Sequence, residues 1–255
     1  MKRAKILHNN KTLNVTVNDE NQVVTADGTC LEEGTFTWLP PCQGKAFVLA
    51  INYADHAAEL SFKAPEEPLV FLKSSNTLIG HDQKTYQPDN IDYMHYECEL
   101  VVVIGKEAKN VSIDNAMDYV GGYTVGNDYA IRDYLENYYR PNLRVKSRDT
   151  CTPVGPYIID ASEIPDPHNL TIRTYINGEL KQEGSTKDLI FNVPYLVSYL
   201  SNIMTLTPGD MIFTGTPEGL AHVYPGDEVI IEVEGVGVLK NTIISETEYV
   251  QSLAH

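Results

Sequence analysis

Two glutamates separated by one residue, Glu97 and Glu99, stand directly before the apolar run LVVVI. Alternate residues of a β-strand share a face, so both carboxylates are expected to point the same way, while Cys98 points to the opposite face. Because the run that follows is apolar at consecutive positions, we expect a strand covered on both sides, with the glutamates at the mouth of a core cavity. A hard divalent cation such as Mg²⁺ or Ca²⁺ would offset the cost of burying them, since it takes carboxylate oxygens as ligands.

A metal site of this kind needs a third acidic ligand, for which Asp128 is the candidate. It stands at the polar end of the strand-like segment GGYTVGND (121–128), where a small turn can present its side chain at the end of a strand. An ExE motif followed by a later aspartate is nevertheless common, and ExE is also typical of a half-exposed strand whose glutamates face water. From the residue types alone, both the metal site and the solvated strand stay open.

His56 and Glu59 lie one helical turn apart in the segment NYADHAAEL (52–60). Residues at i and i+3 face the same side of a helix, so the carboxylate can orient the imidazole and the pair can serve as a general acid and base. An exposed polar pair on a short helix explains the same two residues equally well.

Five of the nineteen Lys and Arg residues fall between residues 132 and 148, in a chain whose formal net charge is −16. They are Arg132, Arg140, Arg144, Lys146 and Arg148. Such a cluster would capture a substrate with more than one carboxylate, because arginine binds carboxylates in a bidentate manner. Arg132 is nearest to Asp128 in sequence and is the first candidate, and Arg144, Arg140 and Lys73 are further ones. Ion pairs with neighbouring acidic residues would account for part of the cluster.

The acidic composition excludes some classes of partner. A net charge of −16 argues against nucleic acid or an anionic membrane surface. No stretch approaches the roughly 18–20 apolar residues that a membrane span requires, and the N-terminal segment lacks the apolar region of a secretory signal. The four cysteines show no CxxC spacing, which favours free thiols in a reducing compartment. We therefore expect a cytoplasmic protein with no nucleic-acid or membrane partner.

Strand-like segments outnumber helical ones, and turns rich in Gly and Pro separate them. This pattern predicts a mainly β (α+β) architecture, closed on itself as a mixed β-roll or barrel, with a few short outer helices. The first 40 or so residues alternate weakly in polarity between Asn-rich turns and predict a small β meander. We expect a small N-terminal β region over residues 1–45 and a catalytic domain over residues 46–255.

Six segments resemble, in order and spacing, the fumarylacetoacetate hydrolase superfamily. They are INYADHAAE (51–59), YECEL (96–100), GYTVGNDYAIRDY (122–134), VKSRDTCTPVGP (145–156), INGEL (176–180) and LTPGDMIFTGTPEGL (206–220). The resemblance extends from about residue 46 to the C-terminus. Longer stretches, such as IDYMHYECELVVVIGK (91–106), are most similar to members that act as isomerases and decarboxylases in homoprotocatechuate (4-hydroxyphenylacetate) degradation.

The resemblance implies a set of metal and substrate ligands. In this superfamily the ExE glutamates and the aspartate of the xND motif hold Mg²⁺ or Mn²⁺, and these match Glu97, Glu99 and Asp128. The open metal positions bind the carboxylate and adjacent keto oxygen of a 2-oxo acid. By the same resemblance, Lys146 lies near the metal ligands and the substrate oxygens, and Thr216 of the TGTP segment hydrogen-bonds the substrate carboxylate.

The resemblance also favours the catalytic interpretation of His56 and Glu59, because related enzymes carry a His–Glu pair on a lid helix that closes over the substrate. His56, assisted by Glu59, would then be the proton carrier. The implied fold is a mixed β-roll whose strands wrap a central cavity. Members form dimers or higher assemblies, so a homodimer or higher homo-oligomer is expected.

The activity implied is that of a divalent-metal-dependent isomerase/decarboxylase acting on unsaturated 2-oxo di- and tricarboxylates of aromatic catabolism. A metal chelated by the 1-carboxylate and 2-oxo oxygens would stabilise the dienolate that decarboxylation and isomerisation share. Within the superfamily, the alternatives are an acylpyruvate- or fumarylacetoacetate-type C–C hydrolase and an oxaloacetate decarboxylase. From another class, a non-catalytic β-domain could bind structural Ca²⁺ through the same carboxylates.

Overall fold

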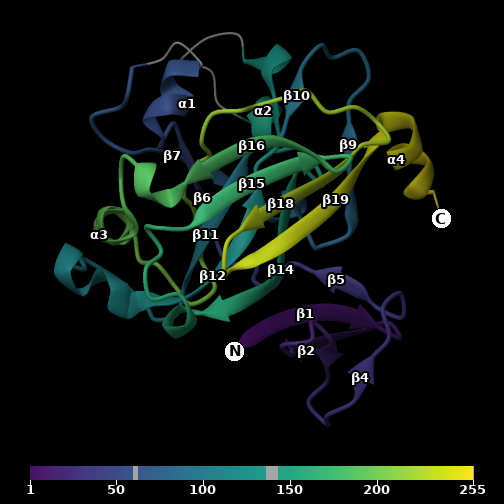
Figure 1. Ribbon diagram of the computed structural model, residues 1–255, viewed down its shortest axis with the longest axis horizontal. Coiled ribbons are helices and arrows are strands. Elements are labelled where there is room, and N and C mark those ends of the chain that lie inside the picture. Colours follow the sequence, from purple (N-terminus) through teal and green to yellow (C-terminus); the bar gives the residue numbers. More distant parts are fainter. Residues whose placement is uncertain (60–62, 136–142, 255) are drawn as a thin grey trace.

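The computed structural model of the chain describes residues 1–59, 63–135 and 143–254. The regular structure is dominated by strands, which form two packed layers with short helices around them (Figure 1). This confirms the expectation of a mainly β protein with few short outer helices.

The larger layer is a mixed sheet of twelve strands. Its order is β4-β3-β2-β1-β14-β12-β11-β17-β6-β7, with β5 beside β1 and β8 beside β14. The strands are β1 (Lys2–His8), β2 (Lys11–Val17), β3 (Val23–Val24), β4 (Cys30–Leu31), β5 (Thr37–Leu39), β6 (Ala46–Ala50), β7 (Leu69–Lys73), β8 (Leu78–Ile79), β11 (Cys98–Ile104), β12 (Val120–Asn127), β14 (Thr152–Asp160) and β17 (Met211–Phe213).

The smaller layer is a five-stranded sheet in the order β16-β15-β18-β19-β9, and a separate two-stranded sheet pairs β10 with β13. Their strands are β9 (Gln83–Gln87), β10 (Met94–His95), β13 (Ala130–Ile131), β15 (Thr171–Ile176), β16 (Glu179–Ser185), β18 (Glu228–Val233) and β19 (Gly237–Ser245). In the described ranges both large sheets end in edge strands and neither closes on itself. The architecture is therefore an open roll, and the predicted closure of the sheet is wrong.

Strand β11 lies at the centre of the large sheet, between β12 and β17, and all of its residues are buried. Leu100 and Val102 belong to the main core, which includes Ile231 of the second sheet. Val101 belongs to a second core cluster that includes Phe213. The prediction of a strand covered on both faces is thus confirmed, and the two alternating sets of side chains fill two different cores.

The N-terminal strands β1 to β5 form the predicted meander and carry a small core of their own, with Ile6 fully buried. Strand β1 pairs antiparallel with β14, so the meander continues the large sheet (Figure 1). A domain boundary at residue 45 stays a prediction.

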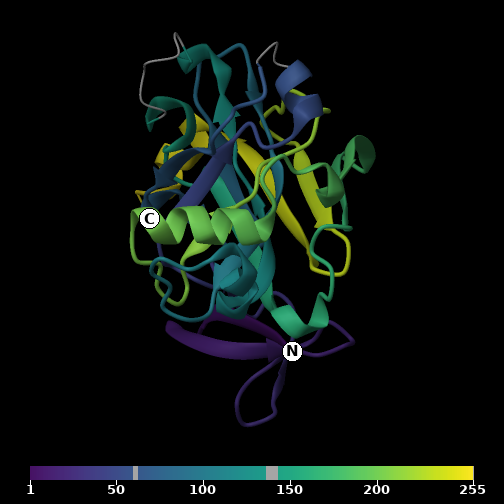
Figure 2. The same cartoon turned by 90° about the vertical axis from the view of Figure 1, so that its left-hand side faces the viewer.

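The helices lie outside the sheets. They are α1 (Ala54–Glu59), α2 (Leu143–Lys146), α3 (Val193–Ile203) and α4 (Glu246–Ser252), with 3₁₀ helices η1 (Ser75–Thr77), η2 (Ile113–Tyr119), η3 (Arg132–Tyr134), η4 (Ala161–Glu163) and η5 (Thr186–Asp188). Helix α3 begins after Asn192, whose side chain accepts a hydrogen bond from the backbone N–H of Tyr195 as an N-cap. Figure 2 shows α3 lying across the outside of the strands beside η2, with the N-terminal strands below.

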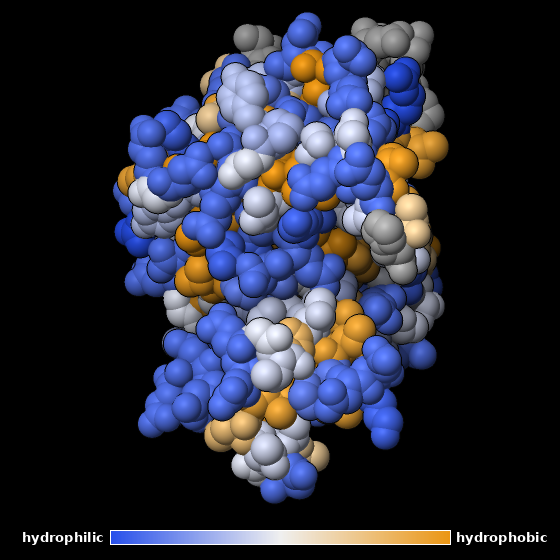
Figure 3. All heavy atoms as spheres, turned by 90° about the vertical axis from the view of Figure 1, so that its right-hand side faces the viewer, coloured by the Kyte–Doolittle hydropathy of each residue, from blue (hydrophilic) through white to orange (hydrophobic). Residues whose placement is uncertain are grey.

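The face drawn in Figure 3 is mostly hydrophilic, and hydrophobic residues reach it in separate areas. Among the described residues, no helix combines the length and apolar character needed to cross a membrane.

Candidate active site

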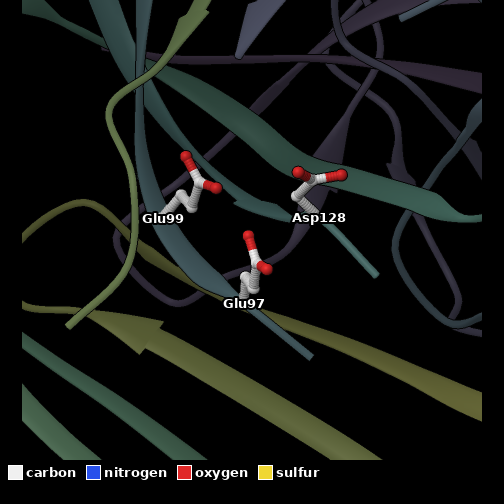
Figure 4. A group of neighbouring side chains, drawn as sticks. All are labelled: Glu97, Glu99 and Asp128. Carbon is white, nitrogen blue, oxygen red and sulfur yellow. The ribbon is translucent and has the colours of Figure 1, made fainter. Parts of the chain in front are cut away.

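Three buried carboxylates, those of Glu97, Glu99 and Asp128, point toward one another (Figure 4). One oxygen from each lies within 4.8 Å of the others. Glu99 is on β11, and Glu97 lies one residue before the strand begins. Because β11 and β12 are antiparallel and Cys98 is paired with Asn127, the start of β11 meets the end of β12. That pairing brings Asp128 to the two glutamates.

The three carboxylates differ in their electrostatic environment. Burial raises the pKa of Glu99 well above its usual range, and the charges of Asp128 and Glu97 raise it further. Burial acts in the same direction on Glu97, but Lys146, Arg132 and His56 outweigh it and leave the pKa of Glu97 lowered. The cluster therefore holds at least one carboxyl group that is poorly compensated by the protein.

The two carboxylate oxygens of Glu99 differ in their hydrogen bonding. Its Oε2 accepts a hydrogen bond from the backbone N–H of Gly215 at 2.6 Å. Its Oε1 is buried without a hydrogen-bond partner in the described part of the chain. A converging set of carboxylate oxygens, one of them unsatisfied, fits the preference of hard divalent cations for oxygen ligands. The residues present thus suit a divalent metal ion.

Two lysines contact the same carboxylates. Lys146 on α2 places Nζ 2.6 Å from Glu97 Oε2 and 2.5 Å from Asp128 Oδ2. Lys73 on β7 donates to Asp128 Oδ1, and the side chains of Lys73 and Asp128 are fully buried. Burial alone would lower the pKa of Lys146, but Asp128 and Glu97 raise it above its usual value. Lys146 is therefore a cation. Lys73 contacts Asp128, a candidate metal ligand, and its role as a substrate ligand stays a prediction.

His56 and Glu59 form the expected pair on α1. The imidazole Nδ1 donates to Glu59 Oε2 at 3.1 Å, and His56 is 4% exposed. The other oxygen, Oε1, accepts the backbone N–H groups of Gly219 and Leu220 at 3.0 and 3.1 Å. The carboxylate of Glu59 thus joins the histidine to the loop that follows β17. His56 is among the groups that lower the pKa of Glu97, after Lys146 and Arg132.

Arg132 is held by a histidine that the sequence patterns left unassigned. Its Nε donates to His95 Nε2 at 2.8 Å, and its Nη2 lies 3.9 Å from Glu97 Oε1. His95 is fully buried, and its Nδ1 contacts the carbonyl oxygen of Tyr96 at 2.9 Å. Because a carbonyl only accepts, Nδ1 carries the hydrogen and Nε2 is free to accept from Arg132. Burial, together with Arg132, holds the pKa of His95 well below its usual range. In the sequence, His95 stands two residues before Glu97, so strand alternation places it on the same face as the two glutamates.

The rest of the predicted basic cluster is dispersed. Arg144 is exposed and lies over the ring of Tyr134 at 4.3 Å. Arg148 pairs with Glu246 of α4 at 3.2 Å. Arg140 lies outside the described residues. Within the described ranges, the members of the cluster that reach the carboxylates are Arg132 and Lys146, and substrate binding by Arg144 stays a prediction.

Thr216 directly follows Gly215, whose N–H binds Glu99. It is 2% exposed, and its Oγ1 accepts a hydrogen bond from Gln182 Nε2 at 3.0 Å. Gln182 could not be predicted as a site residue from the sequence, since an isolated glutamine in an exposed strand carries no recognisable motif.

This arrangement of fold and acidic cluster agrees with comparisons to known proteins. Residues 45–244 match the family described as Fumarylacetoacetate (FAA) hydrolase C-terminal. The chain belongs to the fumarylacetoacetate hydrolase family.

Particular relatives are also similar. The chain is 64% identical over 228 residues to a 4-hydroxyphenylacetate degradation bifunctional isomerase/decarboxylase of Escherichia coli, a match that covers 89% of this chain and 52% of the relative. The chain thus spans about half the length of that protein. An uncharacterized protein of Archaeoglobus fulgidus is 42% identical, with 88% of this chain and 89% of the relative covered.

Two solved structures extend the comparison. The 5-carboxymethyl-2-hydroxymuconate delta-isomerase of Mycobacterium smegmatis has a TM-score of 0.84 at 33% identity, over 96% of this chain and 99% of the other. A fumarylpyruvate hydrolase of Pseudomonas aeruginosa, solved in complex with Mn²⁺ and pyruvate, has a TM-score of 0.75 at 31% identity, over 84% and 93%.

Proposed function

We propose that the chain is a divalent-metal-dependent isomerase/decarboxylase acting on unsaturated 2-oxo di- and tricarboxylates from 4-hydroxyphenylacetate catabolism. The observation that carries the proposal is the buried convergence of Glu97, Glu99 and Asp128, with Glu99 Oε1 lacking a partner among the described residues. The similarity to the isomerase/decarboxylase of Escherichia coli supports the choice of substrate class.

Mg²⁺ or Mn²⁺ would be held by Glu97, Glu99 and Asp128. When bound, the ion would polarise the 2-oxo group of the substrate and stabilise the negative charge that develops on its oxygen. The Mn²⁺ and pyruvate in the fumarylpyruvate hydrolase complex support both the choice of metal class and a 2-oxo acid as ligand.

The charges of the site favour an anionic substrate. When all three buried carboxyl groups are ionised, they carry one negative charge more than the ammonium groups of Lys73 and Lys146 neutralise. A divalent cation would change the net charge of this group from −1 to +1, and a substrate carboxylate would neutralise the remaining positive charge. Arg132 adds a further cation at the edge of the cluster, suited to a second carboxylate of a di- or tricarboxylate.

His56 would move the proton. Glu59 accepts the hydrogen on Nδ1, which leaves Nε2 of His56 to take or give a proton at the substrate. Loss of CO₂ from 5-oxopent-3-ene-1,2,5-tricarboxylate leaves an electron pair that spreads through the conjugated double bond to the 2-oxo oxygen. Protonation gives 2-hydroxyhepta-2,4-diene-1,7-dioate. Removing the enol proton and adding one at the far carbon then gives 2-oxohept-3-ene-1,7-dioate, so one proton carrier serves both steps.

Lys146 and Thr216 would orient the substrate. Lys146 places Nζ beside Glu97 and Asp128, where it would act as a hydrogen-bond donor to the substrate oxygens. The hydroxyl of Thr216 would donate to the substrate carboxylate. Together they would place the 2-oxo acid with its reacting carbons toward His56.

The runner-up function is hydrolysis of a carbon–carbon bond in an acylpyruvate-type substrate. It is favoured by the similarity to fumarylpyruvate hydrolase, at 31% identity. In that case His56 would activate a water molecule, and the products would include pyruvate or a related acid without release of CO₂. Decarboxylation of oxaloacetate would release CO₂ without a dienol intermediate of seven carbons.

A Mg²⁺-dependent assay with 5-oxopent-3-ene-1,2,5-tricarboxylate distinguishes these functions when CO₂ and the ultraviolet absorbance of the dienol are followed together. We expect CO₂ release, with the absorbance rising and then falling as isomerisation proceeds. Enzyme stripped of metal with a chelator is the control and is expected to be inactive. Cleavage of a carbon–carbon bond without CO₂ would instead establish the hydrolase. Metal binding with no turnover of any 2-oxo acid would favour a structural ion.

A homodimer or higher homo-oligomer in the cytoplasm is also proposed, on the strength of the family resemblance. Light scattering of the purified chain measures the oligomeric state directly.

A further inference from the structure

Gln182 is buried on a strand whose other side chains are exposed or half-buried. The strand, β16, is an edge of the five-stranded sheet, and Gln182 is 2% exposed. Burying an amide costs free energy unless its polar atoms find hydrogen-bond partners. The hydrogen-bond partners of Gln182 therefore indicate the role of its side chain.

Those partners fix which way the amide points. Gln182 Nε2 lies 2.8 Å from the carbonyl oxygen of Pro217, which can only accept, so the nitrogen must be on that side. The second hydrogen on Nε2 goes to Thr216 Oγ1 at 3.0 Å. On the other side, Thr174 Oγ1 donates to Gln182 Oε1 at 2.8 Å. Both N–H donors of the amide and one of the two lone pairs of Oε1 are thus used.

This geometry sets the polarity of the Thr216 hydroxyl. Because Nε2 of Gln182 cannot accept, Thr216 Oγ1 must be the acceptor in their bond, and its own hydrogen has to point elsewhere. Across residues 1–59, 63–135 and 143–254, no group accepts that hydrogen, although Thr216 is 2% exposed. The hydroxyl lies one residue from Gly215, which is bonded to Glu99. A buried donor without an acceptor among the described residues thus lies one residue from a direct contact with the carboxylate cluster.

The loop that carries Thr216 is seated directly on β16. A Cβ added to Gly184 would lie 2.5 Å from Pro217 Cβ, so the glycine allows the loop to pack against the strand. Thr174 faces Gln182 across the β15–β16 pair, immediately before an irregularity in the strand register. Irregularities of this kind re-aim side chains beside functional sites.

We propose that Gln182 is a positioning residue that fixes the Thr216 hydroxyl as a hydrogen-bond donor to the carboxylate of the substrate. A carboxylate accepts hydrogen bonds and cannot donate them, so a hydroxyl locked in the donor state is matched to it. The same arrangement disfavours a substrate whose corresponding group is an amide nitrogen or an ammonium. The inference rests on the proposed function, because it takes a 2-oxo acid as the ligand of this site.

The test measures the binding of pyruvate, the simplest 2-oxo acid, to the full chain by calorimetry in the presence of Mn²⁺. Gln182→Glu preserves the shape of the side chain, and in its ionised form it supplies only acceptors, so Thr216 then donates to Glu and turns away from the ligand. We expect the Kd for pyruvate to rise about tenfold or more, as for loss of a hydrogen bond to a charged group. The Kd for Mn²⁺ should stay within about twofold, since the three carboxylates are untouched.

A matched control separates this effect from the burial of an additional carboxylate. Gln87 on β9 is also buried, and its Nε2 donates to the carbonyl oxygen of Val223 at 2.9 Å. Gln87→Glu therefore places the same change opposite a carbonyl without contacting Thr216. Its pyruvate affinity is expected to follow that of the wild type. Thermal unfolding followed by circular dichroism verifies that each variant is folded.

A double-mutant cycle tests whether Gln182 acts through Thr216. Thr216→Val removes the hydroxyl, and Gln182→Met removes the donors while keeping the side-chain length. If the inference holds, adding Gln182→Met to Thr216→Val produces no further loss of pyruvate affinity. Equal losses in both backgrounds, or a Gln182→Glu chain that binds pyruvate as tightly as the wild type, would overturn it. Failure of the wild type to bind pyruvate with either Mn²⁺ or Mg²⁺ would overturn the proposed function itself.

Discussion

His95 Nε2 accepts a hydrogen bond from Arg132 Nε at 2.8 Å, so a fully buried neutral imidazole fixes the orientation of a guanidinium at the edge of the carboxylate cluster. The tautomer is set by the contact of Nδ1 with the carbonyl oxygen of Tyr96. An arginine held through Nε presents its two terminal nitrogens in a fixed plane, which suits bidentate binding of a carboxylate.

Replacing His95 should therefore weaken substrate binding more than it slows the chemical step. His95→Phe keeps a ring in the same place but removes the acceptor for Arg132. We expect KM for the tricarboxylate to rise about tenfold with a smaller change in kcat, because one charge-assisted hydrogen bond no longer orders the guanidinium. Steady-state kinetics measure both constants. His95→Gln keeps an acceptor and should recover part of the loss, whereas an unchanged KM in His95→Phe would contradict the role given to His95.

Glu99→Gln should abolish metal binding without unfolding the protein. The side chain keeps its shape and loses its charge, and burial already disfavours that charge, as the raised pKa of Glu99 indicates. In the absence of metal the variant is expected to be at least as stable as the wild type. Addition of Mn²⁺ at about one hundred times its Kd should stabilise the wild type by about 2.7 kcal/mol and leave the variant unchanged. Thermal unfolding with and without Mn²⁺ measures this stabilisation. Retained turnover in Glu99→Gln would contradict the assignment of Glu99 as a metal ligand.

His56→Gln should separate proton transfer from metal binding. Gln fills a similar volume but cannot exchange a proton near neutral pH, so we expect kcat to fall by about 10²–10⁴. The Kd for Mn²⁺ should stay close to that of the wild type, since His56 is not one of the three converging carboxylates. Calorimetry and the CO₂ assay provide the two measurements. An unimpaired His56→Gln enzyme would remove the acid–base role.

His81 predicts a pH dependence of stability that is independent of the active site. Burial lowers its pKa to about 4, with Lys240 acting in the same direction and Asp82 against it. The unfolded chain binds a proton more readily than the folded one between that value and the ordinary histidine pKa of about 6.5. The free energy of unfolding therefore falls as the pH drops through this window, by up to about 3 kcal/mol for this group alone.

Chemical denaturation between pH 7 and pH 4.5 measures the slope of the free energy of unfolding against pH. His81→Gln removes this titrating group and should reduce the slope, while His95, whose pKa is also lowered by burial, keeps its own contribution. A variant with the same slope as the wild type would assign the pH dependence to other groups.

Strand alternation was enough to predict part of the site. It placed Glu97 and Glu99 on one side and buried the run after them, and the structure agrees because β11 is enclosed by two cores. The partner strand was not predictable by alternation alone. Asp128 reaches the glutamates only because β11 and β12 pair antiparallel in the register that sets Cys98 opposite Asn127.

The basic cluster shows why proximity in sequence is a weak guide to proximity in space. Arg144 and Lys146 are two residues apart on α2, and residues at that spacing do not share a helix face. Lys146 is accordingly buried on the carboxylates while Arg144 is exposed. Gln182 escaped prediction for a related reason, since its importance comes from the loop packed on β16 and not from its neighbours in the chain.

The two carboxylate oxygens of Glu59 contact different parts of the molecule. One oxygen orients His56, and the other binds the backbone of Gly219 and Leu220. A displacement of α1 relative to this loop would break the bonds to Gly219 and Leu220 and shift the carboxylate that orients the imidazole. On the proposed mechanism, an opening made by α1 alone would leave the proton carrier without the carboxylate that orients it.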